Sequence, residues 1–536
     1  MFGTRRSAGR WSRGLLIALL VFASCETQRG RLQITIVDEE GRPTPARVSL
    51  TDASGRAWLA DDALQVRADC AEHWPPREGP SSVLPPGDRA VWDPYTDTMQ
   101  FYSDGTSTVT VPPGTYRATV RKGLEYEAGS GTVTVAAHGV THLRLALRRW
   151  IDMAPTGWLG SDDHLHIART QADEDPEIAT WMEAEDLDVA SLLAMGTPEG
   201  VRAAPQRSFG LPSAFTEGST TLLSGQENPR SNNFGHVVIL GAPAYVDFPE
   251  RYLVYNAFMR AAARDGGLSG YAHFGTTGAR NGLAVDAPEG LVDFLEVLQT
   301  RRLETAVLYE MWNLGIRLTP TAGTDYPCGG VASLPGQERF YAAVREPRSP
   351  RAWLDAIEAG RTFVTNGPML SLTVEEHGIG DVVELGRAGP VRVRGEVRYD
   401  PARERIDRLE LVRNGDVIAT AEGEVASGRL SLDAAPWIDA TSWLALRATG
   451  ERLRAVVDGT RPPVFAHTGT IGVTIPGTPG LDQQEAGQKL LRESLQRVEG
   501  LHAFIRKARI PETDREGLLA AIATARDLYR SRLDPG

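Results

Sequence analysis

The chain has 536 residues, and 57 Lys and Arg residues against 69 Asp and Glu residues give a net charge of −12. A chain of this length exceeds one hydrophobic core and predicts roughly three to four domains. The acidic balance excludes a broad phosphate-binding surface, so we expect no nucleic-acid partner. With 41% hydrophobic and 24% charged residues, the composition is that of a folded protein.

Residues 1–25 have the layout of a bacterial signal peptide, with four arginines, an apolar run at 15–22 and then Ala23-Ser24-Cys25. The apolar run is too short to span a bilayer permanently. The small residues before Cys25 resemble a lipobox, which predicts a lipidated Cys25 as the first mature residue. Ordinary cleavage nearby, giving a secreted soluble protein, is the alternative. We therefore expect export to the periplasm or cell envelope, with membrane contact only through an N-terminal lipid anchor.

Two cysteines, Cys70 and Cys328, follow the signal segment. An oxidising compartment permits a disulfide, but the two residues lie in different predicted domains and sequence supplies no distance between them. We expect them not to pair. Cys328 follows Asp325 closely and is expected in a loop beside the candidate site.

Residues 31–150 read as short alternating strands separated by turn signals, which predicts a small β-sandwich. Two segments, 101–105 and 111–116, resemble the carboxypeptidase-regulatory-like sandwich, and residues 58–100 look like an insertion. The histidines of this region are scattered singly and are interpreted as surface or structural residues: His73, His138 and His142. The domain is expected to be a spacer or an anchor.

Residues 151–370 alternate predicted strands with predicted helices, which favours an α/β domain with parallel strands. An acidic first turn or a glycine marks several boundaries. The predicted strands are 187–193, 268–273 and 317–321. The predicted helices are 248–264, 290–298 and 303–314.

This region contains a His-x-His segment, Gly-Ser-Asp-Asp-His-Leu-His-Ile at 160–167. Alternate side chains of a strand share one face, so His164 and His166 are expected to point at one ion while Leu165 packs the other way. Loops at the ends of α/β strands converge on one mouth, which predicts a shared metal site for residues far apart in sequence. The further candidate ligands lie near predicted strand ends: Glu227, His236, His273 and Asp325.

The order of these segments resembles the PHP (polymerase and histidinol phosphatase) superfamily, and more narrowly its CehA/McbA-type metallohydrolases. The resemblance covers about 150–370 and includes the segments 225–227, 235–236, 271–274, 313–315, 323–325, 339–341 and 360–368. It implies a distorted βα barrel that holds one to three divalent ions, with these metal ligands: His164, His166, Glu227, His236, His273 and Asp325.

The chemistry that the resemblance implies is hydrolysis. Imidazole and carboxylate ligands suit Zn, Mn or Fe, and such an ion lowers the pKa of bound water from about 16 to about 7. Asp163 or Asp325 is predicted to orient the water or accept its proton. Arg339 and Arg361 are candidates for holding a substrate anion, with structural pairing favoured. Glu310 and Asn313 are interpreted as pocket-lining residues or simply a polar helix face.

Residues 371–480 read as strands again, with a hairpin signal at Asn414-Gly415, and predict a second β-sandwich. His467 is expected to be a hydrogen-bonded core residue, with a reach toward the barrel as the alternative. Residues 481–536 carry apolar residues at helical spacing around a break at Pro511, which predicts a helical hairpin. The oligomeric state is left open.

The expected architecture is therefore an α/β central domain, a PHP-type βα barrel, flanked by two β-sandwich domains and a C-terminal helical hairpin. Two functions follow. The first is an exported metal-dependent hydrolase that cleaves an ester, amide or phosphoester bond of a small-molecule substrate. The second is a non-catalytic lipoprotein whose PHP-like barrel is a binding or scaffold module.

Overall fold

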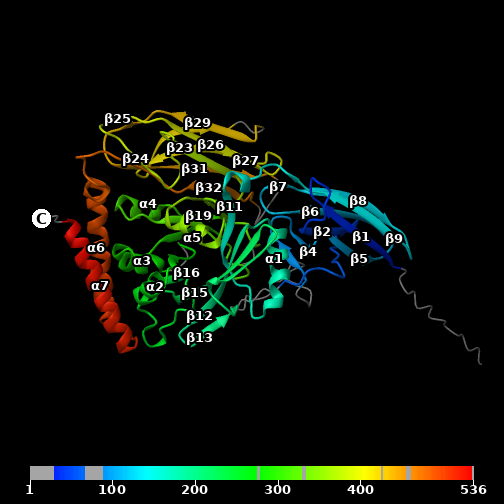
Figure 1. The fold of residues 1–536 in the computed structure, drawn as a ribbon, viewed down its shortest axis with the longest axis horizontal. Coiled ribbons are helices and arrows are strands. Elements are labelled where there is room, and N and C mark those ends of the chain that lie inside the picture. The colour runs from blue at the N-terminus through cyan, green and yellow to red at the C-terminus, as the bar shows by residue number, and fades with distance from the viewer. Residues whose placement is uncertain are drawn as a thin grey trace, which may run out of the picture.

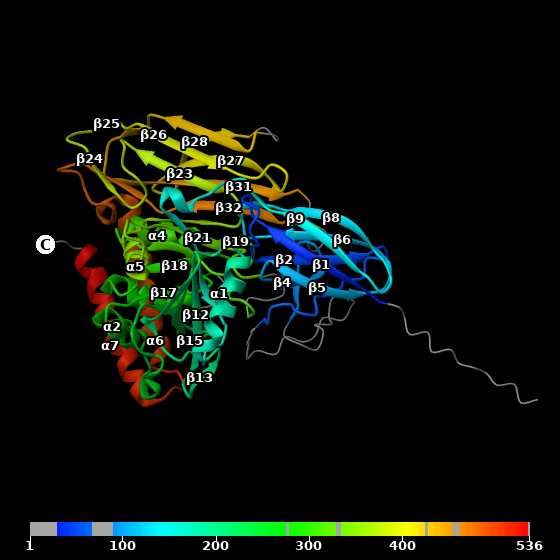
Figure 2. The ribbon, with the colours of Figure 1, turned by 45° about the vertical axis from the view of Figure 1, so that its right-hand side comes forward.

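A computed structural model gives the fold and describes residues 29–66, 89–274, 278–328, 334–423, 427–453 and 460–533. The signal segment 1–25 with its lipidation candidate Cys25 lies outside the described residues, and so do Cys70 and His73. Four parts are visible along the chain: an N-terminal β region, a central region that carries the helices α1 to α5, a C-terminal β region and a pair of long helices (Figures 1 and 2).

The N-terminal β region consists of two facing sheets, with strand orders β5-β1-β9 and β3-β4-β2-β6-β8, and a short pair β7-β10. Leu32, Ile34 and Ile36 of β1 are buried and alternate with more exposed residues, as the two-residue period of a strand requires. The strands are β1 (Gly30–Val37), β2 (Ala46–Asp52), β3 (Val91–Asp93), β4 (Thr98–Ser103), β5 (Thr106–Val111), β6 (Gly114–Arg121), β7 (Tyr126–Glu127), β8 (Gly129–Val135), β9 (Val140–Ala146) and β10 (Arg148–Arg149).

Buried charge pairs tie this region to the central one. Arg47 Nε lies 2.7 Å from Glu185 Oε1, and the Tyr102 hydroxyl donates to the same oxygen at 2.7 Å. Arg149 adds an ion pair to Asp186 at 2.7 Å. Removal of one partner would leave the other charge buried and unpaired, so these pairs determine how the two regions fit together.

The central region is not the α/β barrel predicted from its sequence. Its strands belong to one 18-stranded sheet that begins β11-β12-β13-β14-β15-β16-β17-β18 and continues into the C-terminal region. Parallel pairs occur at β11–β12–β15 and β17–β18–β20, but β15, β16 and β17 pair antiparallel. The strands, in chain order, are β11 (Trp158–Leu165), β12 (Val189–Thr197), β13 (Gly200–Ala203), β14 (Gly210–Glu217), β15 (Thr220–Ser231), β16 (Gly235–Leu240), β17 (Leu268–Tyr271), β18 (Phe294–Gln299), β19 (Arg302–Leu303), β20 (Thr319–Ala322), β21 (Arg339–Ala343) and β22 (Thr362–Thr365).

Two local features explain this correction. Residues 200–240 form the strands β13 to β16 and no helix, with antiparallel pairs β12–β13, β14–β15 and β15–β16. Residues 290–298 were predicted as a helix, but Phe294–Gln299 forms the fully buried strand β18. A short apolar run fits either structure, so its periodicity does not decide between them. The helices that pack on the sheet are α1 (Asp175–Ala184), α2 (Tyr255–Arg264), α3 (Ala279–Asp286), α4 (Ala306–Asn313) and α5 (Pro350–Glu358).

The C-terminal β region, predicted as a second β-sandwich over 371–480, shares a sheet with the central region. Strand β22 pairs antiparallel with β32, so the inner sheet is continuous with the central one. A second sheet, β23-β26-β29, packs across a core that includes Leu372, Val397, Leu411 and Leu446. The strands are β23 (Met369–Val374), β24 (Val382–Glu384), β25 (Gly389–Pro390), β26 (Val393–Arg398), β27 (Glu404–Arg413), β28 (Asp416–Glu422), β29 (Arg429–Ala434), β30 (Trp437–Ile438), β31 (Ser442–Arg452), β32 (Pro463–Thr468) and β33 (Ile471–Thr474).

The chain ends in two long helices, α6 (Glu485–Ile505) and α7 (Glu512–Leu533), which lie beside α2 and α3 (Figures 1 and 2). Tyr529 donates to the Ala284 carbonyl at 3.1 Å, and Asp514 accepts from the Leu253 amide at 2.8 Å. Among the helices of the described ranges, none combines the length and apolarity needed to cross a membrane.

Two adjacent residues of α6 test how much this helix pair contributes to stability. Ile505 is 1% exposed and Phe504 is 53% exposed. We expect Ile505→Ala to lower the free energy of unfolding by about 2–5 kcal/mol, because it leaves a cavity in the core. Phe504→Ala is the matched control and should change it by less than about 0.5 kcal/mol. Urea denaturation followed by far-UV circular dichroism measures both, and equal effects would contradict the packing of α6.

Candidate metal centre

The end of β11 places the first two histidines of the cluster. The Asp162 carboxylate accepts hydrogen bonds from the His164 amide at 3.0 Å, from the Thr324 amide at 3.1 Å and from the Gly336 amide at 2.8 Å. The His166 amide donates to the Tyr326 carbonyl at 2.7 Å. These bonds hold the segment that carries Asp325 against the end of β11.

The remaining candidates lie on or directly after four strands of the same sheet, β15, β16, β17 and β20. Glu227 lies in β15 and His236 in β16, on either side of an irregularity in the register of that pair. His273 follows β17 and Asp325 follows β20. Both have left-handed backbone conformations, with φ of 30° and 52°, and such strained positions concentrate at functional sites.

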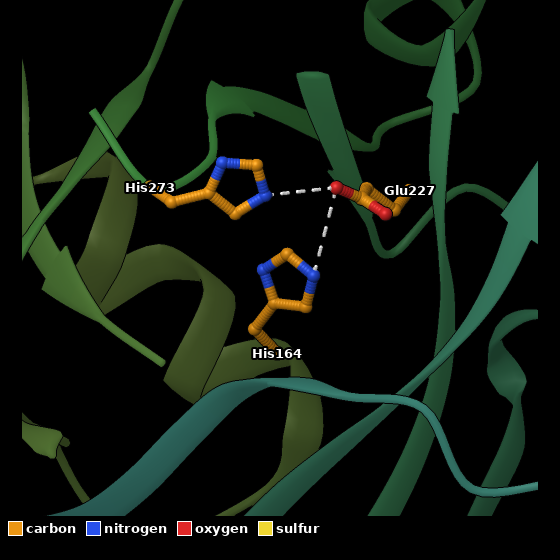
Figure 3. A group of neighbouring side chains, drawn as sticks. All are labelled: His164, Glu227 and His273. Carbon is orange, nitrogen blue, oxygen red and sulfur yellow. Dashed lines mark hydrogen bonds and ion pairs between the residues drawn. The ribbon is translucent and has the colours of Figure 1, made fainter. Parts of the chain in front are cut away.

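The structure brings all six predicted side chains together. His164 Nε2 lies 3.2 Å from His166 Nε2. Asp325 Oδ1 lies 3.4 Å from His164 Nε2 and 3.1 Å from His166 Nε2. On the other side, Glu227 Oε1 lies 2.7 Å from His236 Nδ1, 3.1 Å from His273 Nε2 and 3.8 Å from His164 Nε2. Figure 3 shows how His164 and His273 point at the Glu227 carboxylate from two sides.

Within this cluster, two groups of three side chains have ligating atoms within 4.8 Å of one another: His164, Glu227 and His273, and His164, His166 and Asp325. His164 belongs to both groups, and His236 joins the first through Glu227. The donor set is nitrogen and oxygen only, which suits a borderline divalent ion such as zinc, manganese or iron.

The hydrogen bonds of the two rings on β11 show which ring nitrogens are available as ligands. His166 Nδ1 lies 3.1 Å from the Leu193 carbonyl oxygen, which only accepts, so Nδ1 carries the proton. His164 Nδ1 lies 2.7 Å from Glu296 Oε1 and donates to that carboxylate. In the neutral rings both Nε2 atoms therefore carry lone pairs, 3.2 Å apart, and a proton or a cation can lie between them. A ring that donates one N–H to a carbonyl or carboxylate while its other nitrogen stays available is typical of a metal-ligating histidine.

Burial and charge shift the pKa values of the cluster. Burial by itself lowers the pKa of His164, but Glu296, Asp325 and Glu227 outweigh it and raise that pKa well above its usual value. Burial raises the pKa of Glu227, but Arg230 and His236 outweigh it and hold that pKa well below its ordinary range. The cluster thus keeps a carboxylate ionised in the interior and attracts positive charge to the space between the rings.

The side chains of the cluster differ in their exposure to solvent. The side chains of Asp325 and His236 are each 14% exposed and that of Arg230 is 13% exposed, whereas His164 and His166 are fully buried. Solvent therefore reaches Asp325, His236 and Arg230 more than the two histidines of β11.

Asp163, the other predicted catalytic carboxylate, lies outside this cluster. Its side chain is fully buried against Gly323, and neither oxygen accepts a hydrogen bond within the described residues. Burial, followed by the charge of Glu296, raises the pKa of Asp163 well above its usual value. The geometry therefore favours Asp325 over Asp163 as a group that reaches a substrate.

Sequence reasoning missed three contributors. Glu296 of β18 accepts from His164 Nδ1 at 2.7 Å and from the His273 amide at 2.8 Å, so one carboxylate orients two candidate ligands. Arg230 Nε lies 2.8 Å from Glu227 Oε2. Asp162 joins the two loops of the site. The sequence signal for Glu296 was a charged residue inside the apolar run 294–298. The helix predicted there did not place Glu296 beside the site.

Other residues singled out from the sequence have structural partners. Arg339 donates to the carbonyls of Gly336, Asp186 and Glu185, and Arg361 donates to the Asp355 carbonyl. Glu310 pairs with Arg280, and Asn313 bonds to Asn414 and Trp443. His467 is a buried core residue at 2.6 Å from the Tyr309 hydroxyl.

Cys328 is disulfide-bonded. The expectation concerned its pairing with Cys70, which lies outside the described residues. Domain assignment from sequence gave no information about the approach of segments that are distant along the chain. Because a disulfide sulfur is not a thiolate, Cys328 does not add a soft ligand to the cluster.

No family model and no curated protein matches this chain. Among solved structures, the minor pilin GBS52 of Streptococcus agalactiae is similar over 23% of this chain and 46% of the pilin, with 13% identity and a TM-score of 0.16. The chain thus spans less than half the length of that pilin. A likeness at this level carries no argument about fold or function.

Gly323 tests the contact between β11 and the segment that carries Asp325. A Cβ at this position would lie 2.4 Å from His164 Cβ and 2.7 Å from Asp163 Oδ1. We expect Gly323→Ala to push the two segments apart and to lower the free energy of unfolding by about 1–3 kcal/mol. Gly386, where an added Cβ meets nothing within 4 Å, is the control position. Urea midpoints of both alanine variants measure the difference, and an unchanged midpoint for Gly323→Ala would contradict this geometry.

Proposed function

We propose that the six-residue cluster binds divalent cations and that the protein is a metal-dependent hydrolase of small-molecule esters, amides or phosphoesters. The supporting observation is the facing pair of Nε2 atoms of His164 and His166, 3.2 Å apart, whose Nδ1 atoms both have acceptors. Nearby Asp325 and Glu227 add negative charge. Lone pairs and carboxylates in this arrangement repel one another unless a proton or a cation lies between them.

The order of the six residues along the chain also supports a relationship to CehA/McbA-type metallohydrolases of the PHP superfamily. This proposal uses the ligand order alone, since the chain does not form the barrel. His164, His166 and Asp325 would hold one cation, and Glu227 and His273, with His236 beside them, would hold a second. A mixed nitrogen and oxygen donor set favours zinc, manganese or iron.

Three side chains in or beside the cluster have distinct parts in the proposed reaction. A bound cation would supply Lewis acidity, which would activate water and polarise the oxygen of the scissile group. Glu296 fixes the orientation of the His164 ring through the 2.7 Å bond to Nδ1. Asp325, whose side chain is partly exposed, is positioned to take a proton from the attacking water. Arg230, also partly exposed, provides positive charge for a substrate oxygen.

Partial exposure distinguishes this cluster from a purely structural metal site. Structural sites are closed by protein ligands, whereas catalytic sites keep a position open for water and substrate. Here the exposed side chains, Asp325 and His236, belong to the candidate ligand set itself. We therefore favour the hydrolase over the non-catalytic binding module.

Metal analysis of the purified full chain, paired with His166→Ala, tests the proposal. We expect bound zinc, manganese or iron by mass spectrometry, and chelator-sensitive hydrolysis of a panel of nitrophenyl esters, anilides and phosphates. His166→Ala should lower activity by more than about 100-fold, and Glu296→Gln should lower metal affinity by about 10–100-fold because the ring loses its orienting carboxylate.

His142→Ala makes the same side-chain change at an exposed position of β9 and should alter neither metal content nor turnover. Metal-free protein that cannot be loaded by added cations would contradict the metal centre. Protein that binds the metal but hydrolyses nothing on the panel would instead favour the non-catalytic binding module.

We also propose that the protein is exported and anchored by a lipid on Cys25, because residues 1–25 combine arginines, an apolar run and small residues before the cysteine. Cys25→Ser should move the protein from the membrane fraction to the soluble fraction, because it removes the residue that carries the lipid. Immunoblots of fractionated cells measure this, with Thr27→Ala as the control. An unchanged distribution would exclude the anchor.

A further inference from the structure

A cavity of about 490 Å³ lies where the N-terminal, central and C-terminal regions meet, away from the metal centre. Its walls include strands β2 and β6, the segment 334–339 after the Asp325 loop, and residues 400–403 of the C-terminal region. None of the six cluster residues lines it. Five arginine side chains do: Arg47, Arg121, Arg339, Arg403 and Arg452.

Arg121 is the cavity arginine for which no hydrogen-bonded partner exists among the described residues, although Asp93 and Glu185 lie near enough to raise its pKa. It lies opposite Arg47 on the neighbouring strand. Arg47 engages both nearby carboxylates, Glu185 at 2.7 Å and Asp93 at 2.9 Å. Among the described residues, no carboxylate or carbonyl accepts a hydrogen bond from Arg121. Burial lowers the pKa of Arg121, which reflects the free-energy cost of a cation held out of water beside a like charge.

Two further donors of the cavity wall lack acceptors although they are buried. Arg452 is 8% exposed and Tyr95 is 9% exposed, and within the described ranges neither Arg452 Nε nor the Tyr95 hydroxyl has a hydrogen-bond partner. Arg452 Nη2 donates to the Asn366 carbonyl at 2.6 Å. The Arg452 guanidinium lies over the Tyr95 ring, 4.7 Å from its centre. Arg403 Nε is a third buried donor without an acceptor. Buried donors without partners are rare and costly, so their concentration on one wall requires an explanation.

The wall also contains carboxylates, Asp93, Glu127, Glu185 and Asp400, and an apolar part. Leu124, Tyr126, Trp150 and Leu334 line the same space. A ligand that fits therefore combines acceptor oxygens, which would face the guanidinium groups, with an apolar body. Such a combination of a mostly apolar cavity and a few converging polar groups is typical of a small-molecule site.

We propose that this cavity binds a small organic anion, a carboxylate or phosphate group on an apolar body, and that Arg121, Arg452 and Tyr95 hold its oxygens. Planar guanidinium groups match carboxylate and phosphate oxygens in pairs. The cavity shares no lining residue with the metal centre, and the Gly336 amide in its wall donates to the Asp162 carboxylate beside that centre.

Calorimetric titration of the full chain with benzoate, phenylphosphonate and neutral benzamide tests the site. We expect at least one anion to bind and benzamide not to bind. Arg121→Gln should weaken anion binding by about tenfold or more, and Tyr95→Phe, which removes one donor and leaves no acceptor unpaired, should weaken it several-fold. His166→Ala should bind the anion as the wild type does, which separates this cavity from the metal centre.

A stability measurement distinguishes ligand binding from a structural role of Arg121. Without the anion, Arg121→Gln should raise the melting temperature by a few degrees, because it removes an unpaired buried cation. Arg42→Gln, at a residue with a 72% exposed side chain, is the control and should leave both anion binding and melting temperature unchanged. Absence of anion binding, equal binding of benzamide, or unaltered anion affinity in Arg121→Gln would overturn the proposal.

Discussion

The interaction on which the functional site depends is the mutual approach of ligand-type atoms in a buried space. His164 and His166 have their Nδ1 atoms engaged, so their Nε2 atoms face one another and the carboxylates of Asp325 and Glu227. These atoms cannot satisfy one another, because lone pairs and negative charges repel. The cluster is therefore stable only with positive charge at its centre, which is why a divalent cation is the simplest occupant.

The sheet supplies the precision that this cluster needs. Glu227 and His236 are held by the ladder of β15 and β16, and His273 and Asp325 follow strands that flank β18. Glu296 lies on that middle strand and contacts both His164 and the backbone of His273. Residues on adjacent strands are fixed relative to one another by backbone hydrogen bonds, so candidate ligands distant along the chain keep a common geometry.

The distribution of buried charge differs between the two sites of the molecule. In the metal cluster, carboxylates outnumber the nearby guanidinium group of Arg230. In the cavity between the regions, Glu185 and Asp93 are engaged by Arg47, and Arg121 is left without an acceptor. Each imbalance points to a ligand of opposite charge, a cation in the first case and an organic anion in the second. Both conclusions rest on the same principle, that an unpaired buried charge costs more than a satisfied one.

Residue types and their order determined the chemistry that this chain offers. The His-x-His segment and four later carboxylate or imidazole residues were recognisable because strand periodicity and the rarity of histidine are properties of the sequence. The strand at 268–271 and the strand at 319–322 also lie where their patterns predicted. Tertiary structure alone decided the pairing: β13 to β16 have antiparallel partners although β12 and β15 pair parallel, β18 replaces a predicted helix, and Cys328 is disulfide-bonded. The orientation of the His164 ring by Glu296 could not be predicted from the sequence. The lack of a hydrogen-bond acceptor for Arg121 among the described residues could not be predicted either. The physical reason is that local patterns report which face of a segment is apolar, whereas strand partners and charge partners depend on contacts between segments far apart along the chain.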